Sequence, residues 1–294
     1  MALLAASLCL AAGCTTAPAP DPTASIGPVR ELTARETALL HDAEQILVRD
    51  CMRQHGFRYF PLPRNPVPEN RSFPYVIDDV TWARRHGYGS DIQRRLAELD
   101  EADPNRRYYN SLSPAQRTAA LAAINGERPV GLSARLPSGG VMARSDRSCT
   151  SAAERELYRD LPTWYRVEHV TDDVVGLWRG QVAGDPAFRA AVGRWAVCMR
   201  EHGYGYTSPA LARAELTRPD QPAGRDREIQ VAVAEATCAT STGLAATATA
   251  LDQHYASQVR RQYAPEFATR QRLELAALPR AGATVSADRG TTTQ

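Results

Sequence analysis

The chain has 294 residues, with 35 basic and 33 acidic side chains, a formal net charge of +2 and 43% hydrophobic residues. The hydrophobic content is sufficient for a folded core, and the length indicates one or two domains. The balanced charge provides no basic stripe, which argues against nucleic-acid binding. All basic residues other than histidine are arginine, so a Schiff-base lysine, a phosphate-loop lysine and a Ser-x-x-Lys nucleophile are excluded.

The amino terminus is apolar from residue 2 to residue 12, and this run ends at Gly13-Cys14. It is shorter than the about 20 residues of a membrane-spanning helix and has the length of a signal-peptide core. Ala11-Ala12-Gly13-Cys14 resembles the bacterial lipobox, although no arginine or lysine precedes the apolar run. We therefore expect residues 1–13 to be a signal peptide and Cys14 to be the site of lipid attachment.

Residues 14–30 are rich in proline, alanine and threonine and poor in core-forming residues. This composition predicts an extended tether between the lipid anchor and the folded part. Acyl chains such as palmitate would supply the affinity for the membrane. The predicted location is the extracellular face of the cell membrane, and no cofactor is expected.

Four cysteines lie downstream of the anchor, at Cys51, Cys149, Cys198 and Cys238. An even number of cysteines in an exported chain favours disulfide bonds, and four cysteines allow three pairings. We expect all four to be paired.

A short repeat favours one of these pairings. The segment 51–59 recurs at 198–206 with six identical positions of nine. The cysteine of each copy closes an apolar helical stripe, and one further cysteine follows each copy in a helix-like segment. One disulfide per copy would join Cys51 to Cys149 and Cys198 to Cys238. The first spacing is the longer one, so the first copy carries an insertion.

Both copies contain a His-Gly-aromatic element that predicts how the helix ends. Gly56 and Gly203 can adopt the left-handed conformation that follows a helix, which places His55 and His202 at the C-cap. The element recurs at residues 86–88 without a cysteine, so the stop does not depend on a thiol.

Other local signals define the fold class. Thr33-x-x-Glu36 predicts a capping box, and Ser113-Pro114 and Asp185-Pro186 predict helix starts. Strand signals are weak and restricted to short pieces such as 75–77 and 165–170. The predicted fold is mainly α, with two copies of a disulfide-closed helical unit, the first with an insertion, and a long C-terminal helix. The predicted divisions are a first repeat at 31–160, a second at 161–279 and a disordered tail at 280–294.

The chain resembles a group of uncharacterised surface lipoproteins of high-GC Gram-positive bacteria. The resemblance rests on the lipobox, the paired Cys-Met-Arg-x-x-Gly elements at Cys51 and Cys198, the Tyr-Gly-Tyr-like segments and the Ser-Leu-Ser-Pro-Ala-Gln helix start. It covers most of the chain, but Ser148 stands where a glycine is expected before Cys149. The resemblance implies a surface location and carries no activity.

Metal binding is the most specific chemical alternative to a structural role for these cysteines and histidines. Cys51 with His55, and Cys198 with His202, are i,i+4 pairs that can bind one face of a metal ion, and two docked pairs would give a Cys₂His₂ site. Two points argue against a metal site: the histidines fit as helix caps, and export to an oxidising compartment would convert the thiols to disulfides. The structural interpretation is favoured, and no metal ligand is assigned.

An envelope hydrolase with an unrecognised site is the second alternative. Adjacent acids at Asp78-Asp79 and Asp172-Asp173, with Glu168-His169, could take part, but neighbouring side chains do not converge on a helix. No catalytic residue is assigned. The favoured function is a binding or accessory module with an envelope protein as a possible partner. The aromatic segments at 57–63 and 204–209 could contact that partner or close the core, and the core is preferred.

Overall fold

The structure is a computed structural model that describes residues 30–218 and 224–292. These residues form twelve helices and one two-stranded sheet, so the predicted mainly α class is confirmed. The elements of the first half are α1 (Ala34–Gln54), α2 (Val80–His86), α3 (Ser90–Glu101), α4 (Pro104–Ser111), α5 (Pro114–Asn125), β1 (Gly131–Arg135), β2 (Val141–Ser145) and α6 (Cys149–Tyr158). The elements of the second half are α7 (Leu161–Gly184), α8 (Pro186–Glu201), α9 (Pro209–Leu216), α10 (Arg225–Ser241), α11 (Leu244–Gln262) and α12 (Ala264–Thr292).

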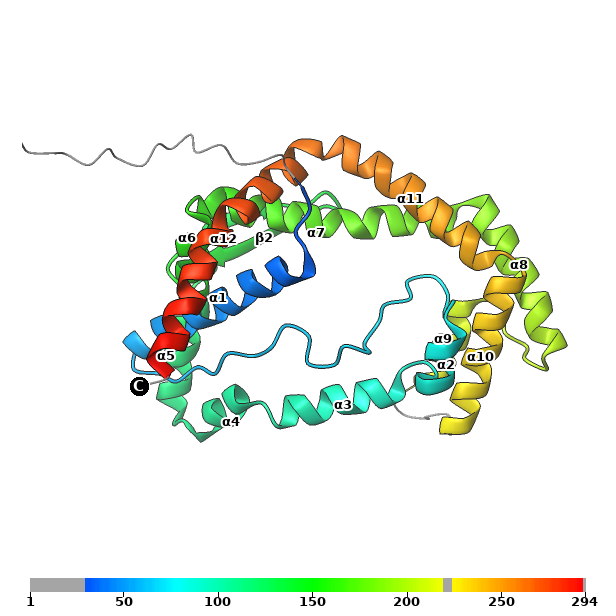
Figure 1. The fold of residues 1–294 in the computed structure, drawn as a ribbon, viewed down its shortest axis with the longest axis horizontal. Coiled ribbons are helices and arrows are strands. Elements are labelled where there is room, and N and C mark those ends of the chain that lie inside the picture. Colours follow the sequence, from blue (N-terminus) through cyan, green and yellow to red (C-terminus); the bar gives the residue numbers. More distant parts are fainter. Residues whose placement is uncertain (1–29, 219–223, 293–294) are drawn as a thin grey trace, which may run out of the picture.

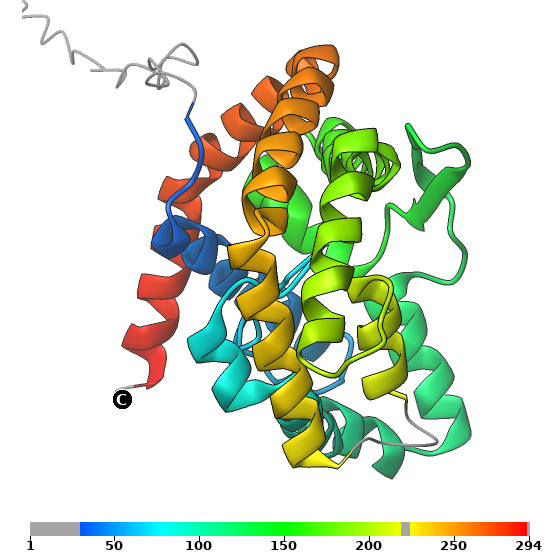
Figure 2. The ribbon, with the colours of Figure 1, turned by 90° about the vertical axis from the view of Figure 1, so that its right-hand side faces the viewer.

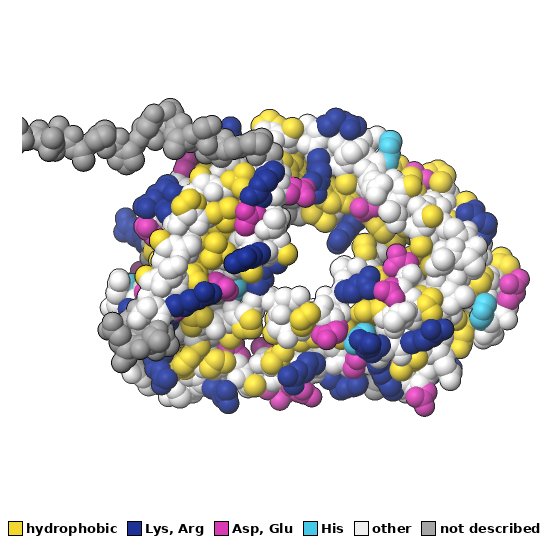
Figure 3. Space-filling model, viewed as in Figure 1, with side chains coloured by type: hydrophobic (Ala, Val, Ile, Leu, Met, Phe, Trp, Pro, Cys, Tyr) yellow, Lys and Arg dark blue, Asp and Glu magenta, His cyan; other side chains and the backbone are white. Residues whose placement is uncertain are grey.

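The elements are arranged as a ring around a central opening. Figure 1 shows α1, α5, α6 and α12 at one end and α8, α9, α10 and α2 at the other. The space-filling view in Figure 3 shows that side chains leave this opening unfilled. Seen from the side, α11 and α10 follow one another beside α8 (Figure 2). We call the two ends the first unit (α1, α5, α6, α12 and the β1–β2 hairpin) and the second unit (α8, α9 and α10).

The core of the first unit joins the start of the described chain to its end. α1 packs against α6 and α12, and their cluster includes Leu40 and Ala43 of α1, Leu157 of α6 and Ala281 of α12. The antiparallel hairpin adds Leu132 to the same cluster. A spacing of three or four residues on each helix places these side chains on one face, where their burial stabilises the unit.

The core of the second unit is centred on α8. Trp195 and Met199 of α8 are fully buried, together with Val231 of α10 and Leu244 of α11. Ala212 of α9 is also fully buried in this cluster. The two units are therefore separate hydrophobic cores and not one continuous core.

One side of the ring is a helical pair that joins the two units. α7 and α11 pack along one another, and Val174, Trp178 and Val259 form a small cluster between them. The indole Nε1 of Trp178 donates to Asp252, 3.2 Å away. This pair carries the chain from the first unit to the second and back again.

The other side of the ring is formed by residues 57–111, the part of the chain in which the sequence predicts an insertion. Segment 57–79 has no helix or strand, and α3 and α4 return along it towards the first unit (Figure 1). At the far end α2 packs against α10, with Ile77 and Ala83 in a cluster with Ala232 and Ala236. The insertion is thus a bridge that closes the ring.

Two fully buried glutamates of α10 hold this bridge on the second unit. Glu235 accepts a hydrogen bond from the backbone N–H of Ile77 at 2.8 Å and another from the Tyr88 hydroxyl. Glu228 accepts from the backbone N–H of Tyr88 at 2.8 Å and from both the backbone N–H and the hydroxyl of Ser90. Unpaired buried polar groups are costly, so these bonds compensate for burying both the carboxylates and the backbone.

The predicted helix ends are confirmed in both copies. His55 and His202 are the C-caps of α1 and α8, and Gly56 and Gly203 follow with φ angles of +82° and +85°. Phe57 N–H donates to Met52 O and Gly56 N–H to Arg53 O, the hydrogen-bond pattern of a Schellman motif, and the second copy repeats both bonds. The third His-Gly-aromatic element, at residues 86–88, ends its helix differently. His86 is the buried last residue of α2, and Gly87 is the C-cap.

The predicted helix starts are also present. Capping boxes form at Thr33 with Glu36 and at Ser113 with Gln116, and Asp185 caps α8. Pro265 is the second residue of α12, directly after the junction at which α11 ends.

Two sequence predictions are wrong. Residues 280–292, expected in a disordered tail, belong to α12, because Ala277, Ala281 and Val285 recur every four residues and pack on α1. The expected extended pieces do not pair: residues 165–170 lie inside α7, and residues 75–77 form a coil bound to Glu235. The sheet is instead a hairpin at 131–145. No helix within the two described ranges combines the length and the apolar character needed to cross a bilayer.

We expect Gly87→Ala to destabilise the protein by about 1–3 kcal/mol, the usual cost of a strained backbone conformation. Gly87 has a φ of +59°, and a Cβ atom there would lie 2.8 Å from the Glu228 Oε1 atom. Chemical denaturation followed by circular dichroism measures the loss.

Gly180→Ala is the matched control for this prediction. Gly180 lies inside α7 without a positive φ, and an added methyl group there would meet nothing within 4 Å, so alanine should keep or slightly raise the stability. Equal stabilities of the two variants would show that Glu228 does not constrain the bridge.

Candidate functional site

The cysteines selected by the repeat form two disulfides, Cys51–Cys149 and Cys198–Cys238. Their Cα–Cα distances are 5.5 Å and 5.7 Å, and they close separations of 98 and 40 residues. The first joins α1 to the start of α6, and the second joins α8 to α10. The predicted pairing is therefore confirmed, with one disulfide in each unit.

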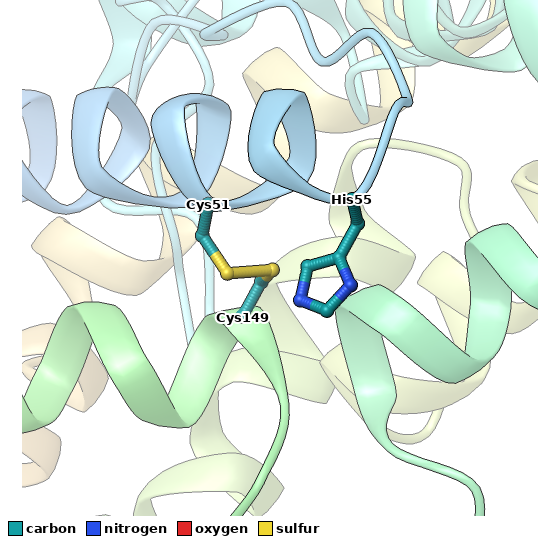
Figure 4. Close-up of side chains that lie close together, drawn as sticks. All are labelled: Cys51, His55 and Cys149. Carbon is teal, nitrogen blue, oxygen red and sulfur yellow. A yellow bond between two sulfur atoms is a disulfide. The ribbon is translucent and has the colours of Figure 1, made fainter.

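A histidine lies beside each disulfide because the cysteine and the C-cap are four residues apart on one helix. Figure 4 shows His55 next to the Cys51–Cys149 bond. In the second unit, His202 Nδ1 lies 3.9 Å from Cys198 Sγ and 3.7 Å from Cys238 Sγ. The same nitrogen is 2.9 Å from the backbone oxygen of Cys198, as expected for a ring that caps the helix.

The geometry leaves the metal alternative without its ligands. The atoms that could bind a metal lie within 4.8 Å of one another in two groups, Cys51, His55 and Cys149, and Cys198, His202 and Cys238. Both cysteines of each group are consumed by a disulfide, whereas a metal requires the thiolate. The two Cys-x-x-x-His pairs lie in separate units and do not combine into one site.

A surface cavity of about 890 Å³ adjoins His55. Its wall includes two acidic residues, Glu127 and Asp146, and two arginines, Arg128 and Arg147. Gly126 and Gly131 of the same wall have positive φ, and Ser145 and Asp146 occupy the space of their missing side chains. The charges of this cavity are balanced, so they favour neither an anion nor a cation.

The aromatic segments after each helix stop serve mainly the core. Phe57 packs on the cluster around Met52, and the Tyr59 hydroxyl donates to Gln45 at 2.8 Å. Tyr204 and Tyr206 pack on the cluster of the second unit. The preference for the core over a partner surface agrees with these contacts.

The adjacent acids considered for hydrolysis do not converge. Asp79 caps α2 and pairs with Arg71, Asp172 pairs with Arg270, and Asp173 accepts from Ser138 at the turn of the hairpin. His169 Nδ1 is 2.9 Å from the Tyr165 carbonyl oxygen. These four groups thus each have a structural partner.

A cluster of carboxyl groups that the sequence did not reveal lies where α1, α6, α7 and α12 meet. Burial raises the pKa of Glu44 to about 7 and that of Glu168 to about 8, and the charge of Glu154 adds to both shifts. Glu154 is itself buried and pairs with Arg144. Burial also raises the pKa of Glu274, which pairs with Arg270. No sequence motif joins these residues, because each comes from a different helix.

Comparisons with protein-family models, with curated proteins and with solved structures found no match to this chain. Cys14, the predicted lipid attachment site, lies outside the described residues.

Removing either disulfide should cost about 2–5 kcal/mol of stability, because each closes a long loop. We propose the double variants Cys51→Ala with Cys149→Ala, and Cys198→Ala with Cys238→Ala, compared by denaturant unfolding. Alkylation without reduction, followed by peptide mapping, checks the pairing in the parent chain. Free Cys51 or Cys198 in that map would contradict the structure and reopen the metal alternative.

The raised pKa of Glu168 predicts how folding stability changes with pH. In the unfolded chain this group ionises near its usual value of 4.5, whereas the folded protein keeps the proton up to about pH 8. Folding stability due to this group therefore falls as pH rises from about 4.5 to about 8. Glu168→Gln should remove that part of the slope and stabilise the protein above pH 8. One pKa unit corresponds to about 1.4 kcal/mol, so even a fraction of the shift is measurable.

Glu36→Gln provides the opposite case. Its hydrogen bond with Arg30 lowers the pKa of Glu36 to about 2, so its contribution is present above pH 4.5 and is lost only in acid. The substitution should lower stability without changing the slope between pH 4.5 and pH 8. If Glu168→Gln also left the slope unchanged, the buried carboxyl cluster would not be coupled to folding.

Proposed function

We propose that the chain is a lipid-anchored binding or accessory module on the outer face of a bacterial cell membrane. In this proposal residues 1–13 are a signal peptide, Cys14 carries the lipid, and the ring is held outside the cell by the tether at 14–30. The observation that carries the binding role is the ring itself, which has a disulfide at each end and an opening between its sides (Figure 3).

The disulfides suggest an extracellular or otherwise oxidising compartment, because cytosolic thiols are kept reduced. The lipobox-like Ala11-Ala12-Gly13-Cys14 supports export with lipid attachment. These two observations are independent, since one concerns the folded units and the other the amino terminus.

Arg30 and Glu31, which lie where the tether would end, are both fixed on the ring by ion pairs. Arg30 pairs with Glu36 of α1, and Glu31 pairs with Arg260 near the end of α11. Residue 30, where the tether is expected to end, is therefore held near the ends of α1 and α11.

A rigid frame is the physical requirement for a binding module, because a site that is already ordered loses less entropy on binding. Disulfides and separate cores fix the two units, and α7 with α11 sets the distance between them. We propose in addition that the two Cys-Met-Arg-x-x-Gly segments derive from a duplicated unit, and that the chain belongs with the surface lipoproteins that it resembles. Their shared Schellman endings support this proposal.

Cys14→Ala tests the anchor. In a bacterial host that processes lipoproteins, metabolic labelling with an alkyne fatty acid should label the parent chain, and Cys14→Ala should lose the label. Cys9→Ala is the matched control, because it changes a cysteine of the same apolar region and should keep the label. Label remaining on Cys14→Ala, or no label on the parent, would refute lipid attachment at this residue.

A further inference from the structure

A second cavity, of about 510 Å³, lies where the bridge meets the second unit. Its wall is formed by the end of segment 57–79, the junction of α2 and α3, and one arginine each from α7 and α9. This cavity depends on the insertion, because most of its wall is the bridge.

The charged side chains that line this cavity are all basic. Three arginines line it, Arg71, Arg179 and Arg213, and none of the described residues in its wall is acidic. Glu235, which bonds to Ile77 and Tyr88 of the wall, is fully buried and already accepts two hydrogen bonds.

The three arginines are used to different extents by the protein. Arg71 pairs with Asp79, and Arg213 donates to the backbone oxygen of Phe73 at 2.8 Å. The Arg179 side chain is exposed and makes no hydrogen bond or ion pair with the described residues, and its charge acts on the nearby Tyr75 hydroxyl. A guanidinium group presents several N–H donors in one plane, which match a carboxylate or a phosphate. Arg179 therefore has its full donor capacity available for a ligand.

The rest of the wall is aromatic and apolar. Phe73 and Trp82 lie with their ring centroids 4.7 Å apart, and Tyr88 and Ile92 continue the surface. The guanidinium of Arg71 lies 4.9 Å from the Phe73 ring centroid. Such a wall favours a planar or apolar group, whereas the arginines favour an anion.

We infer that this cavity binds a small organic anion that joins a planar ring to a carboxylate or phosphate group. The anionic group bonds to Arg179 and the free donors of Arg213, and the ring packs against Phe73 and Trp82. The inference rests on the proposed binding function and names its ligand class.

The test uses the full chain in non-ionic detergent and isothermal titration calorimetry with four probes: phenyl phosphate, benzoate, inorganic phosphate and the neutral benzyl alcohol. Phenyl phosphate or benzoate should bind more tightly than inorganic phosphate and the alcohol. Arg179→Gln should weaken binding by about tenfold or more, the value expected for one charge-assisted hydrogen bond. Because Arg179 has no partner among the described residues, this variant should fold normally.

Arg94→Gln, an exposed substitution on α3 outside the cavity, is the control with the same change of charge and should bind within about twofold of the parent. Equal losses in the two variants, or equal binding of the anions and the alcohol, would overturn the inference. Inorganic phosphate binding as tightly as phenyl phosphate would overturn the role of the aromatic wall. If no probe binds while fatty-acid labelling at Cys14 persists, the ligand class is wrong and the anchored module remains; if that labelling is absent, the proposed anchor fails independently.

Discussion

The ring depends on two buried carboxylates of α10 that hold a segment from the other end of the molecule. Burying a carboxylate is expensive unless it is hydrogen-bonded, and Glu228 and Glu235 meet that condition only when the bridge is docked. The docked segment needs the bonds as well, because Ile77 and Tyr88 lie outside helices and strands and their N–H groups have no ladder to join. The carboxylates of α10 and the backbone N–H groups of the bridge thus supply each other's hydrogen-bond partners. Arg225 completes the contact by donating to the carbonyl oxygens of Arg85 and His86 at the end of α2.

The same contact creates the cavity that we assign to an organic anion. Phe73, Trp82 and Tyr88 reach the second unit only because the bridge is held there. Without docking, α9 would still present Arg213 and α7 would present Arg179, but no aromatic wall would face them. The bridge therefore has a structural role, and in our proposal it also has a binding role. In the second copy, the shorter stretch between the two cysteines contains α9 and most of α10, and α10 receives the bridge.

Local features of this fold could be predicted from the sequence, and long-range ones could not. Helix ends at Gly56 and Gly203, capping boxes and the cysteine pairing follow from residues that lie close together or repeat. The contact between Gly87 and Glu228 could not be predicted, because the two residues are 141 positions apart and no sequence pattern links them. The helix at 280–292 was missed although Ala277, Ala281 and Val285 mark its buried face, because small residues give a weak apolar stripe. The cavity lined by Arg71, Arg179 and Arg213 could not be predicted either, because its arginines and aromatic residues come from four separate parts of the chain.

The exclusive use of arginine has a structural consequence in this protein. Several arginines end helices other than their own by donating to carbonyl groups of the last turn: Arg225 on α2, Arg117 on α4 and Arg280 on α6. Arg117 and Arg225 each bond two carbonyl groups, and Arg280 uses two nitrogens on the Leu157 oxygen. A lysine ammonium would not supply a planar fork of this kind. Arg213 donates to the carbonyl oxygen of Phe73, which lies in the coil of segment 57–79, whereas Arg179 has neither a carbonyl nor a carboxylate partner among the described residues. Arg179 thus keeps a planar set of N–H donors beside the aromatic wall, and the inferred anion site rests on this geometry.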